Sequence, residues 1–224
     1  MHNGEDVLAL NVKRIIDLSV TISTFMPAGA LAPLPELRPV AILCKEGYNA
    51  ENYSSSTHTG THFDAPYHFS ETGETIDRLD LNLLIGDGFC IPVSPAGREI
   101  GASDLSLKWR SEFDGKIILL NTGWSKKRGF TKEFYYDYPG LDIDAAEFLV
   151  KHGVRIIGID SLGMEPSGKT IVHKTLLERG TVFIEDLANL DELEAMKRYF
   201  IVSLPLKLKN ASGAMARVVA LDVY

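Results

Sequence analysis

Residues 57–68 read THTGTHFDAPYH and hold three of the six histidines of this 224-residue chain. In an extended backbone, alternate side chains point to the same side. His58, His62 and Asp64 have the same parity, so an extended segment here turns two imidazoles and a carboxylate one way. The segment therefore predicts a strand with one chemically active face.

A flat strand cannot be the whole arrangement. At ~3.3 Å per residue it would hold the Cα atoms of His58 and His62 roughly 13 Å apart, which is the limit of what two imidazoles can bridge through one ion. Gly60 lies between them and allows a bend or bulge. A helix would also bring positions four apart together, but Thr and Gly are poor helix residues. We therefore expect an extended segment that bends at Gly60.

These side chains have the chemistry of a catalytic metal site. Imidazole nitrogen and carboxylate oxygen suit Zn²⁺, Mn²⁺ or Fe²⁺. Three protein ligands leave a position for water, whose pKa the metal would lower. His68 could be a further ligand or the general acid/base beside the metal. Ordinary hydrogen-bonded histidines are the alternative, but three histidines and an aspartate within eleven residues favour the metal.

The same segment resembles the HxGTHxDxPxH signature of the cyclase-like metal hydrolases, a family that includes bacterial kynurenine formamidases and isatin hydrolases. Residues 15–19 (IIDLS), 69–77 (FSETGETID) and 158–161 (GIDS) are also similar to that family. The resemblance implies an α/β fold: a mixed, β-rich single domain with a barrel-like core, of the swivelling β/β/α type. It also implies a homodimer or homotetramer.

The resemblance further implies one or two divalent ions per chain, Zn or Mn, with Asp64 bridging the two. Glu185 ends a short apolar segment, and His173 lies early in a helix that precedes it. Asp186 is a possible substitute for Glu185, and His68 takes the acid/base role. The implied metal ligands are His58, His62, Asp64, His173 and Glu185.

The activity implied is hydrolysis of a small-molecule amide, specifically arylformamidase action on N-formylkynurenine. Residues 27–33 form the expected substrate-facing loop, yet they lack the aromatic residue that many relatives place there. Phe25, Tyr53, Tyr67 and Trp124 are candidates to line an aromatic pocket. Three alternatives stay open: a cyclic amidase of the isatin-hydrolase kind, a non-hydrolytic metal-dependent cyclase or dehydratase, and a small-molecule-binding protein without turnover.

A second motif competes with this interpretation. Residues 163–170, GMEPSGKT, match the phosphate-binding pattern G-x-x-x-x-G-K-[ST] between an expected strand and an expected helix. The chain continues for only 54 residues after Thr170 (224 − 170), too few for the rest of a nucleotide-binding sheet. We therefore prefer an ordinary loop with an exposed Lys169, in which Glu165 and Lys169 could border the pocket.

Composition fits a folded enzyme. The chain is 45% hydrophobic and 24% charged, and its 23 basic against 30 acidic residues give a net charge of −7. This excludes a disordered chain and argues against nucleic-acid binding. Two isolated cysteines indicate neither a disulfide framework nor a zinc ribbon. Without a signal peptide or an apolar run of ~18 residues, we expect a cytoplasmic protein with no membrane partner and one domain over residues 1–224.

Short apolar runs outnumber helical patterns, which predicts α/β with a large β component. The proline-rich segment 27–39 should be an ordered, irregular loop. Strands are expected at 15–22, 40–43, 88–93, 116–121, 154–159, 181–184, 200–205 and 214–223, and helices at 103–110, 142–152, 171–179 and 190–198.

Overall fold

The computed structural model describes residues 11–29 and 33–223. Its centre is a sheet that closes on itself in the order β12-β11-β5-β7-β9-β10-β4 and back to β12, with β1 (Arg14–Asp17) added along β12. The ring strands are β4 (His62–Asp64), β5 (Ile85–Pro92), β7 (Ile117–Asn121), β9 (Ile156–Ile159), β10 (Val182–Glu185), β11 (Arg198–Pro205) and β12 (Gly213–Asp222).

Closure depends on the length of β12, which has ten residues. Its first residues pair antiparallel with β4, where Gly213 lies opposite Asp64 and Met215 opposite His62. Its later residues pair with β1 on that same edge, where Val219 lies opposite Asp17. A sheet closed in this way leaves no free edge at β4, so the three-residue β4 is hydrogen-bonded on both sides.

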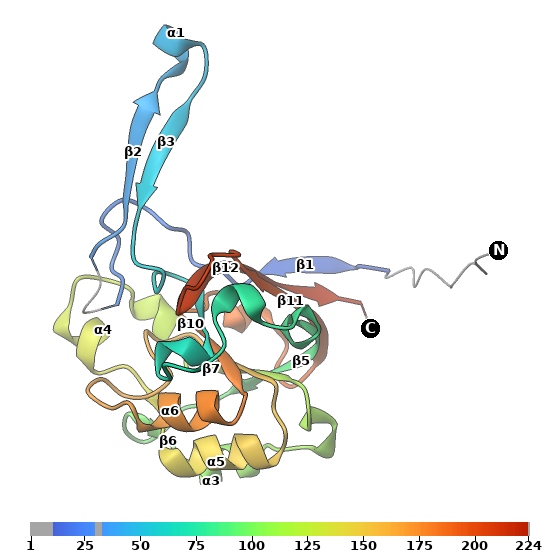
Figure 1. Cartoon of the computed structure of the whole chain (residues 1–224). Coiled ribbons are helices and arrows are strands. Elements are labelled where there is room, and N and C mark those ends of the chain that lie inside the picture. Colours follow the sequence, from blue (N-terminus) through green and yellow to red (C-terminus); the bar gives the residue numbers. More distant parts are fainter. Residues whose placement is uncertain (1–10, 30–32, 224) are drawn as a thin grey trace.

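Alternation along the strands builds two apolar layers. Ile117 and Leu119 of β7 point into the ring, where they join buried side chains from all seven strands. Ile118 and Leu120 point outward and pack under the helices α3 (Ala102–Ser106), α5 (Ile143–Lys151) and α6 (Ile171–Glu178). Figure 1 shows these helices together on one side of the sheet.

The same alternation sends polar side chains to the outer face. Phe63 and Ile184 lie opposite each other in the β4–β10 pair and both belong to the interior cluster. Their neighbours His62, Asp64 and Glu185 must therefore point outward, toward the side that α6 covers. The site is thus placed between the outside of the ring and the beginning of α6.

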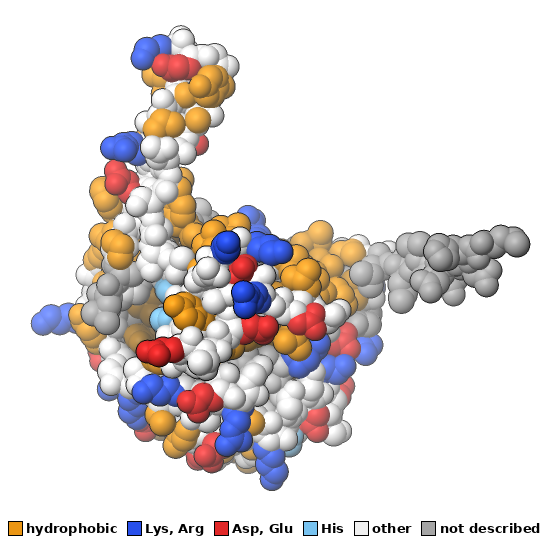
Figure 2. Space-filling view, in the orientation of Figure 1, with side chains coloured by type: hydrophobic (Ala, Val, Ile, Leu, Met, Phe, Trp, Pro, Cys, Tyr) orange, Lys and Arg blue, Asp and Glu red, His pale blue; other side chains and the backbone are white. Residues whose placement is uncertain are grey.

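A hairpin arm projects from this body (Figure 1). It consists of β2 (Glu36–Ala41), β3 (Ala50–Ser54) and, at its tip, the short helix α1 (Leu43–Glu46). Several of its large apolar side chains are exposed, among them Leu43 (61%) and Tyr48 (60%). Figure 2 shows apolar surface along the arm and a histidine surface in a hollow near its base.

The remaining elements are short. They are β6 (Glu99–Ile100), β8 (Gly140–Leu141), α2 (Leu81–Leu84), α4 (Lys132–Tyr136) and the 3₁₀ turns Pro66–His68, Ile76–Arg78, Ser111–Phe113, Trp124–Lys127 and Leu190–Glu192. Within the described part of the chain, no helix has the length and apolar character that a membrane crossing requires.

The predicted fold class, a mixed α/β domain with a barrel-like core, is confirmed. Three local predictions were wrong. The strand expected at 40–43 ends at Ala41, and the helix α1 begins at Leu43. The helix expected at 190–198 is a 3₁₀ turn followed by β11, because Leu190 and Leu193 pack into the ring interior. The proline-rich segment 27–39 is only partly a loop, since β2 begins at Glu36 and pairs with β3, a strand that the sequence did not predict. Residues 30–32 of that segment lie outside the described residues.

Candidate metal centre

Gly60 makes the bend that the sequence predicted. Its φ is +61°, a left-handed conformation that glycine adopts without the Cβ penalty of other residues. β4 begins only at His62, so His58 lies in the preceding loop rather than in a continuous strand. The bend brings the His58 and His62 ring centroids to 5.2 Å from each other. The Gly60 carbonyl accepts a hydrogen bond from His62 Nδ1 at 2.8 Å, which turns Nε2 toward the site.

Three of the predicted ligands form a first group. His58 Nδ1 lies 2.7 Å from Asp64 Oδ1. His62 Nε2 lies 3.4 Å from the same oxygen. One ligand atom from each of the three residues falls within 4.8 Å of the others, which is the spacing that a shared ion needs. The far nitrogen of His58, Nε2, lies 2.9 Å from Ser212 Oγ.

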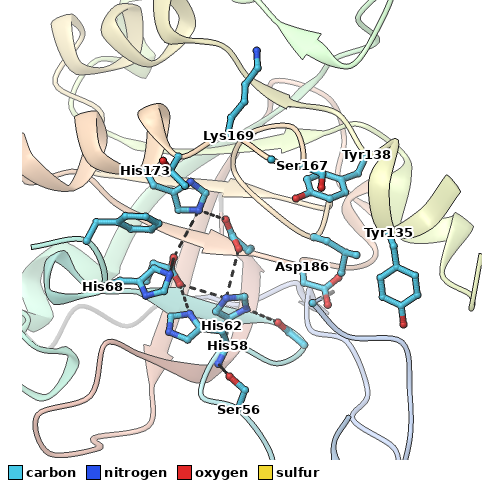
Figure 3. A pocket seen from close by; sticks show the side chains of 18 of the residues that line it. Ser56, His58, His62, His68, Tyr135, Tyr138, Ser167, Lys169, His173 and Asp186 are labelled. Carbon is cyan, nitrogen blue, oxygen red and sulfur yellow. Dashed lines mark hydrogen bonds and ion pairs between the residues drawn. The ribbon is translucent and has the colours of Figure 1, made fainter. Parts of the chain in front are cut away.

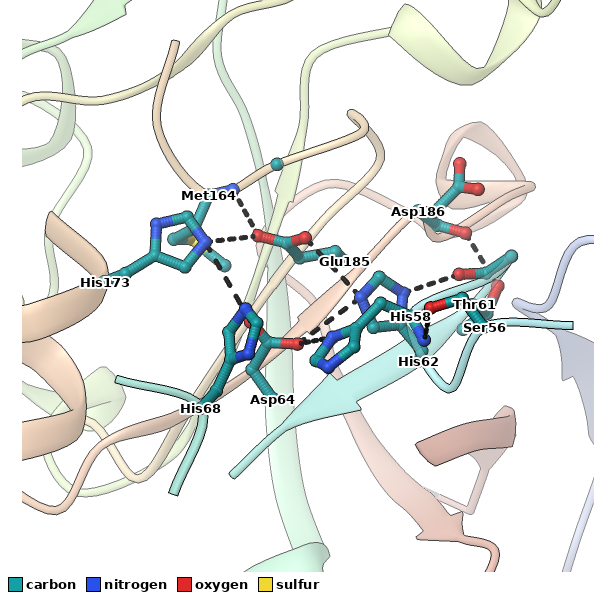
Figure 4. Close-up of polar contacts among 12 residues, drawn as sticks. Ser56, His58, Thr61, His62, Asp64, His68, Met164, His173, Glu185 and Asp186 are labelled. Atoms are coloured by element: carbon teal, nitrogen blue, oxygen red, sulfur yellow. Dashed lines mark hydrogen bonds and ion pairs between the residues drawn. The ribbon is translucent and has the colours of Figure 1, made fainter. Parts of the chain in front are cut away.

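The other two predicted ligands join Asp64 in a second group. His173 comes from the first turn of α6, and its Nε2 lies 3.1 Å from Glu185 Oε1 and 3.9 Å from Asp64 Oδ2. Asp64 therefore offers Oδ1 to one group and Oδ2 to the other (Figure 4). The structure thus brings together all five residues that the sequence proposed as ligands.

One atom shows that these groups fit a cation. His62 Nε2 is buried and makes no hydrogen bond among the described residues. It points between two carboxylates, at 3.4 Å from Asp64 Oδ1 and 3.6 Å from Glu185 Oε2. A buried polar atom without a partner is costly, and imidazole with carboxylates is a donor set that suits Zn²⁺ or Mn²⁺. The residues present therefore fit a divalent ion.

The electrostatics agree with that fit. Burial alone would lower the pKa of His62, but the nearby carboxylates of Asp64 and Glu185 outweigh it and raise the pKa to about 9. Burial also opposes protonation of His173, yet Glu165 and Glu185 raise its pKa to about 10. Burial would raise the pKa of Asp64, but His58 and His62 hold it well below its usual range. The carboxylates create a negative field that cations, either protons or a metal ion, must neutralise.

His68 has a different environment. It ends the 3₁₀ turn Pro66–His68, and its ring stacks on His58 with centroids 4.1 Å apart. Its Nε2 lies 3.5 Å from Asp64 Oδ2, and its side chain is 31% exposed. Burial lowers the pKa of His68, in contrast to the raised values at His62 and His173. His68 can therefore be neutral near neutral pH and accept a proton.

The cluster lines a cavity of about 570 Å³, which is a usual size for a small-molecule site. Figure 3 shows the histidines at one side of it and Tyr135 and Tyr138 at the other. Gly29 and Pro33 from the expected substrate-facing loop also line it, together with Phe69 and Leu162. The aromatic residues predicted for this role were the wrong ones: Phe25, Tyr53, Tyr67 and Trp124 are absent from the lining among the described residues.

The contacts argue against two alternatives from the sequence. Asp186, considered in place of Glu185, has its carboxylate paired with Arg128. At 163–170, the N–H groups that would hold a phosphate at the start of α6 donate instead to the chain's own Glu165, and Lys169 pairs with Glu99. The match to a phosphate-binding loop is therefore a coincidence of sequence, although Lys169 does border the cavity.

Two supporting residues could not be assigned from the sequence. Glu165 was expected only to border the pocket, but it is buried and accepts a hydrogen bond from His173 Nδ1 at 2.6 Å. Ser212 lies 154 residues from its partner His58, just before β12. The Ser212 contact depends on ring closure by β12, and the Glu165 contact depends on how the loop before α6 folds back on its first turn, so no sequence pattern signals either one.

Comparison with known proteins identifies the family. The Cyclase family model matches residues 16–166, which include β4 and the 3₁₀ turn after it. This chain belongs to the Cyclase family. Among curated relatives of this Cyclase member, kynurenine formamidase of Geobacillus thermodenitrificans is 34% identical over 173 residues, covering 75% of this chain and 78% of the relative.

Solved structures of the Cyclase fold agree. Isatin hydrolase A from Labrenzia aggregata, bound to benzyl benzoate, superposes with a TM-score of 0.83 at 26% identity and covers 94% of each chain. A predicted metal-dependent hydrolase from Bacillus stearothermophilus has a TM-score of 0.78 at 29% identity, covering 93% of this chain and 98% of its own. Both alignments extend beyond the matched segment to almost the whole chain.

Proposed function

We propose that this Cyclase-family protein is a metal-dependent hydrolase that cleaves the C–N bond of a small-molecule amide. The observation that carries the proposal is the pair of ligand groups that share Asp64, with the unpartnered His62 Nε2 between carboxylates. These groups lie on the wall of a cavity large enough for a small aromatic molecule. The kynurenine formamidase relative supports the choice of an amide as substrate.

The five ligands would hold one or two ions, either zinc or manganese. His58, His62 and Asp64 would hold one, and Asp64, His173 and Glu185 the other. When bound, such an ion supplies Lewis-acid chemistry: it lowers the pKa of water and polarises an amide carbonyl.

His68 would carry the proton. Its Nε2 faces the cluster at 3.5 Å from Asp64, and the ring is held by stacking on His58 and by Phe69 at its edge. Hydrolysis adds water across the C–N bond, so one proton must leave the attacking water and one must reach the departing nitrogen. His68 Nε2 can accept the first and donate it back to that nitrogen, which balances the reaction without any further acid.

An aryl formamide such as N-formylkynurenine is the substrate we favour. Phe69, Tyr135 and Tyr138 give the cavity aromatic walls, and offset contacts with a substrate ring are favourable there. A cyclic aromatic amide of the isatin kind is the second candidate, supported by the superposition on isatin hydrolase A. A metal-dependent cyclase or dehydratase would use the same ligands and differs only in its product.

Metal content and turnover test the proposal together. We expect one to two zinc or manganese ions per chain by mass spectrometry, and hydrolysis of N-formylkynurenine by the metal-loaded protein. His62→Ala should lose at least one ion and the activity. His152→Ala is the matched control, because His152 lies away from the cavity and pairs with Asp114. Folded protein that takes up no ion after refeeding would overturn the hydrolase mechanism and leave a binding role.

We further propose that the working form is a homodimer or homotetramer acting on a small-molecule substrate. The projecting arm supports this, because it exposes apolar side chains that a second copy could cover. The cytoplasmic location and the extent of the domain over residues 1–224 stay predictions from the sequence.

A further inference from the structure

Glu165 is a buried carboxylate that accepts three hydrogen bonds from N–H groups of the chain. It lies in the loop between β9 and α6 and is 1% exposed. Oε2 accepts the Val172 N–H at 3.0 Å, and Oε1 accepts the His173 N–H at 3.2 Å. Oε1 also accepts His173 Nδ1–H at 2.6 Å. A carboxylate, which only accepts, satisfies all three N–H groups at once.

These bonds determine which His173 nitrogen reaches the site. Because Nδ1 is held by Glu165, Nε2 is the nitrogen that faces Glu185 and Asp64. The two backbone bonds fix the first turn of α6 to the same carboxylate, so the ring and its helix are oriented together. In metal proteins, a carboxylate on the far nitrogen of a ligand histidine fixes the tautomer and the ring orientation.

The position of Glu165 is itself fixed by close packing. A Cβ added to Gly140 in β8 would lie 2.5 Å from the Glu165 Cα, so this backbone approach requires glycine. Met164, the neighbour of Glu165, donates its N–H to Glu185 Oε1 at 2.6 Å and hydrogen-bonds to Leu141 through its carbonyl. One loop segment thus holds both His173 and Glu185.

We propose that Glu165 is the positioning residue of the second ligand group: it orients His173 so that Asp64, His173 and Glu185 can bind a divalent ion. The inference rests on the proposed function, since it requires a metal at this site. None of the hydrogen bonds of Glu165 among the described residues reaches His58 or His62, so its effect belongs to the second group alone.

A double-mutant cycle on metal affinity tests this without an activity assay. Zinc is titrated into metal-free wild type, Glu165→Gln, His173→Ala and the double variant, in competition with a chelating indicator. Glu165→Gln places an amide N–H₂ group against backbone donors and should lower the zinc affinity of the second group by ~10–100-fold. The double variant should bind no more weakly than His173→Ala, because Glu165 acts through His173.

The controls separate a positioning role from general damage. Glu99→Gln removes an exposed carboxylate that pairs with Lys169 in the same loop, and it should leave zinc affinity unchanged. Circular dichroism confirms that each variant is folded. If Glu165→Gln does not fold, Glu165→Asp takes its place: it keeps the charge but cannot reach His173, and should also weaken zinc binding.

Three results would overturn the inference. In the first, Glu165→Gln binds zinc as tightly as wild type while His173→Ala does not. In the second, His173→Ala itself leaves zinc affinity unchanged, so the second group binds no ion. In the third, the double variant binds zinc a further tenfold more weakly than His173→Ala, so Glu165 acts elsewhere. A wild type that binds no zinc would instead overturn the proposed function.

Discussion

Among the histidines of the cavity, His68 is distinguished by its partial exposure and its lowered pKa. His62 and His173 have buried nitrogens that face carboxylates, whereas His68 reaches the cavity from a 3₁₀ turn and is 31% exposed. Three of these four histidines lie in one short segment, so the sequence predicted their chemistry. The division of roles among them came only from the family resemblance, because burial depends on what the ring and α6 place around each ring nitrogen.

Replacing His68 should separate chemistry from metal binding. We expect His68→Gln to lower kcat by ~10²–10⁴-fold, the usual contribution of a general acid/base, because the other histidines that line the cavity are assigned to the metal as ligands. Metal content should stay at the wild-type value, since the five ligands are untouched. Steady-state kinetics on N-formylkynurenine with parallel metal analysis measures both. Loss of an ion from His68→Gln would instead make His68 a ligand.

At the scale of elements, the predictions that succeeded were those where local pattern and tertiary environment agree. The apolar runs at 116–121 and 154–159 became β7 and β9 because both faces of each strand are covered. The segment 190–198 has good helix formers, yet Met196 has a φ of +59° and β11 begins at Arg198. Burial of Leu190 and Leu193 in the ring interior, with β11 pairing to β5 from Arg198 onward, outweighs local helix propensity there.

The contact of β12 with β4 gives a prediction at this scale. A Cβ on Gly213 would lie 2.4 Å from the Phe63 carbonyl oxygen and 2.6 Å from His58 Cε1. We expect Gly213→Ala to destabilise the fold by ~1–3 kcal/mol through overpacking and to weaken metal binding by moving His58. Urea unfolding and zinc titration check the two effects. Gly97→Ala is the control, since nothing lies within 4 Å of its added Cβ. Wild-type zinc affinity in Gly213→Ala would contradict the expected movement of His58.

The 3₁₀ turn Ile76–Arg78 contains Asp77, a carboxylate whose hydrogen bonds are lost when acid protonates it. Asp77 accepts hydrogen bonds from Thr75 Oγ1 at 2.7 Å and from the Asn210 N–H at 2.9 Å, and these lower its pKa below 3.8. A carboxyl whose folded pKa is below its unfolded value stabilises the fold above the unfolded pKa, and this is lost as the pH falls toward the folded pKa.

Asp77→Asn should therefore make the free energy of unfolding less dependent on pH in the acid range. The wild type should lose stability more steeply than the variant as the pH falls through 3.8. Above that pH, Asp77→Asn should be somewhat less stable than wild type. Urea midpoints measured across this range give the comparison, and parallel curves for the two proteins would contradict it.

At the scale of the whole molecule, the arm is the part that the sequence predicted least well. Its strands lack a buried alternating face, since β2 is exposed at every position but Ala41. Periodicity of burial is the signal on which sequence reasoning depends, so a hairpin in solvent gives little of it. Most ring strands were recognisable as short apolar runs because both of their faces are covered, whereas the barrel-like closure was implied by the family resemblance.

The exposed tip of the arm makes the proposed assembly testable. We expect Leu43→Ser with Tyr48→Ser to weaken self-association by at least about tenfold, because these side chains are 61% and 60% exposed in a single chain. Light scattering during size-exclusion chromatography gives the mass at each concentration. Leu107→Ser is the control, since Leu107 is 87% exposed but lies on the body. A monomeric wild type, or an unchanged mass in the arm variant, would contradict this role for the arm.

Closure of the ring by β12 also has a consequence for biosynthesis. β4 carries His62 and Asp64 and is held between β10 and β12, and β12 begins only at Gly213, far along the chain from β4. As a ribosome makes the protein, the ligand histidines therefore emerge long before the strand that completes their surroundings. In the nascent chain, β4 stays unpaired on one edge until β12 has been synthesised. The surroundings of His62 and Asp64 are therefore complete only after β12 has been synthesised and has paired with β4.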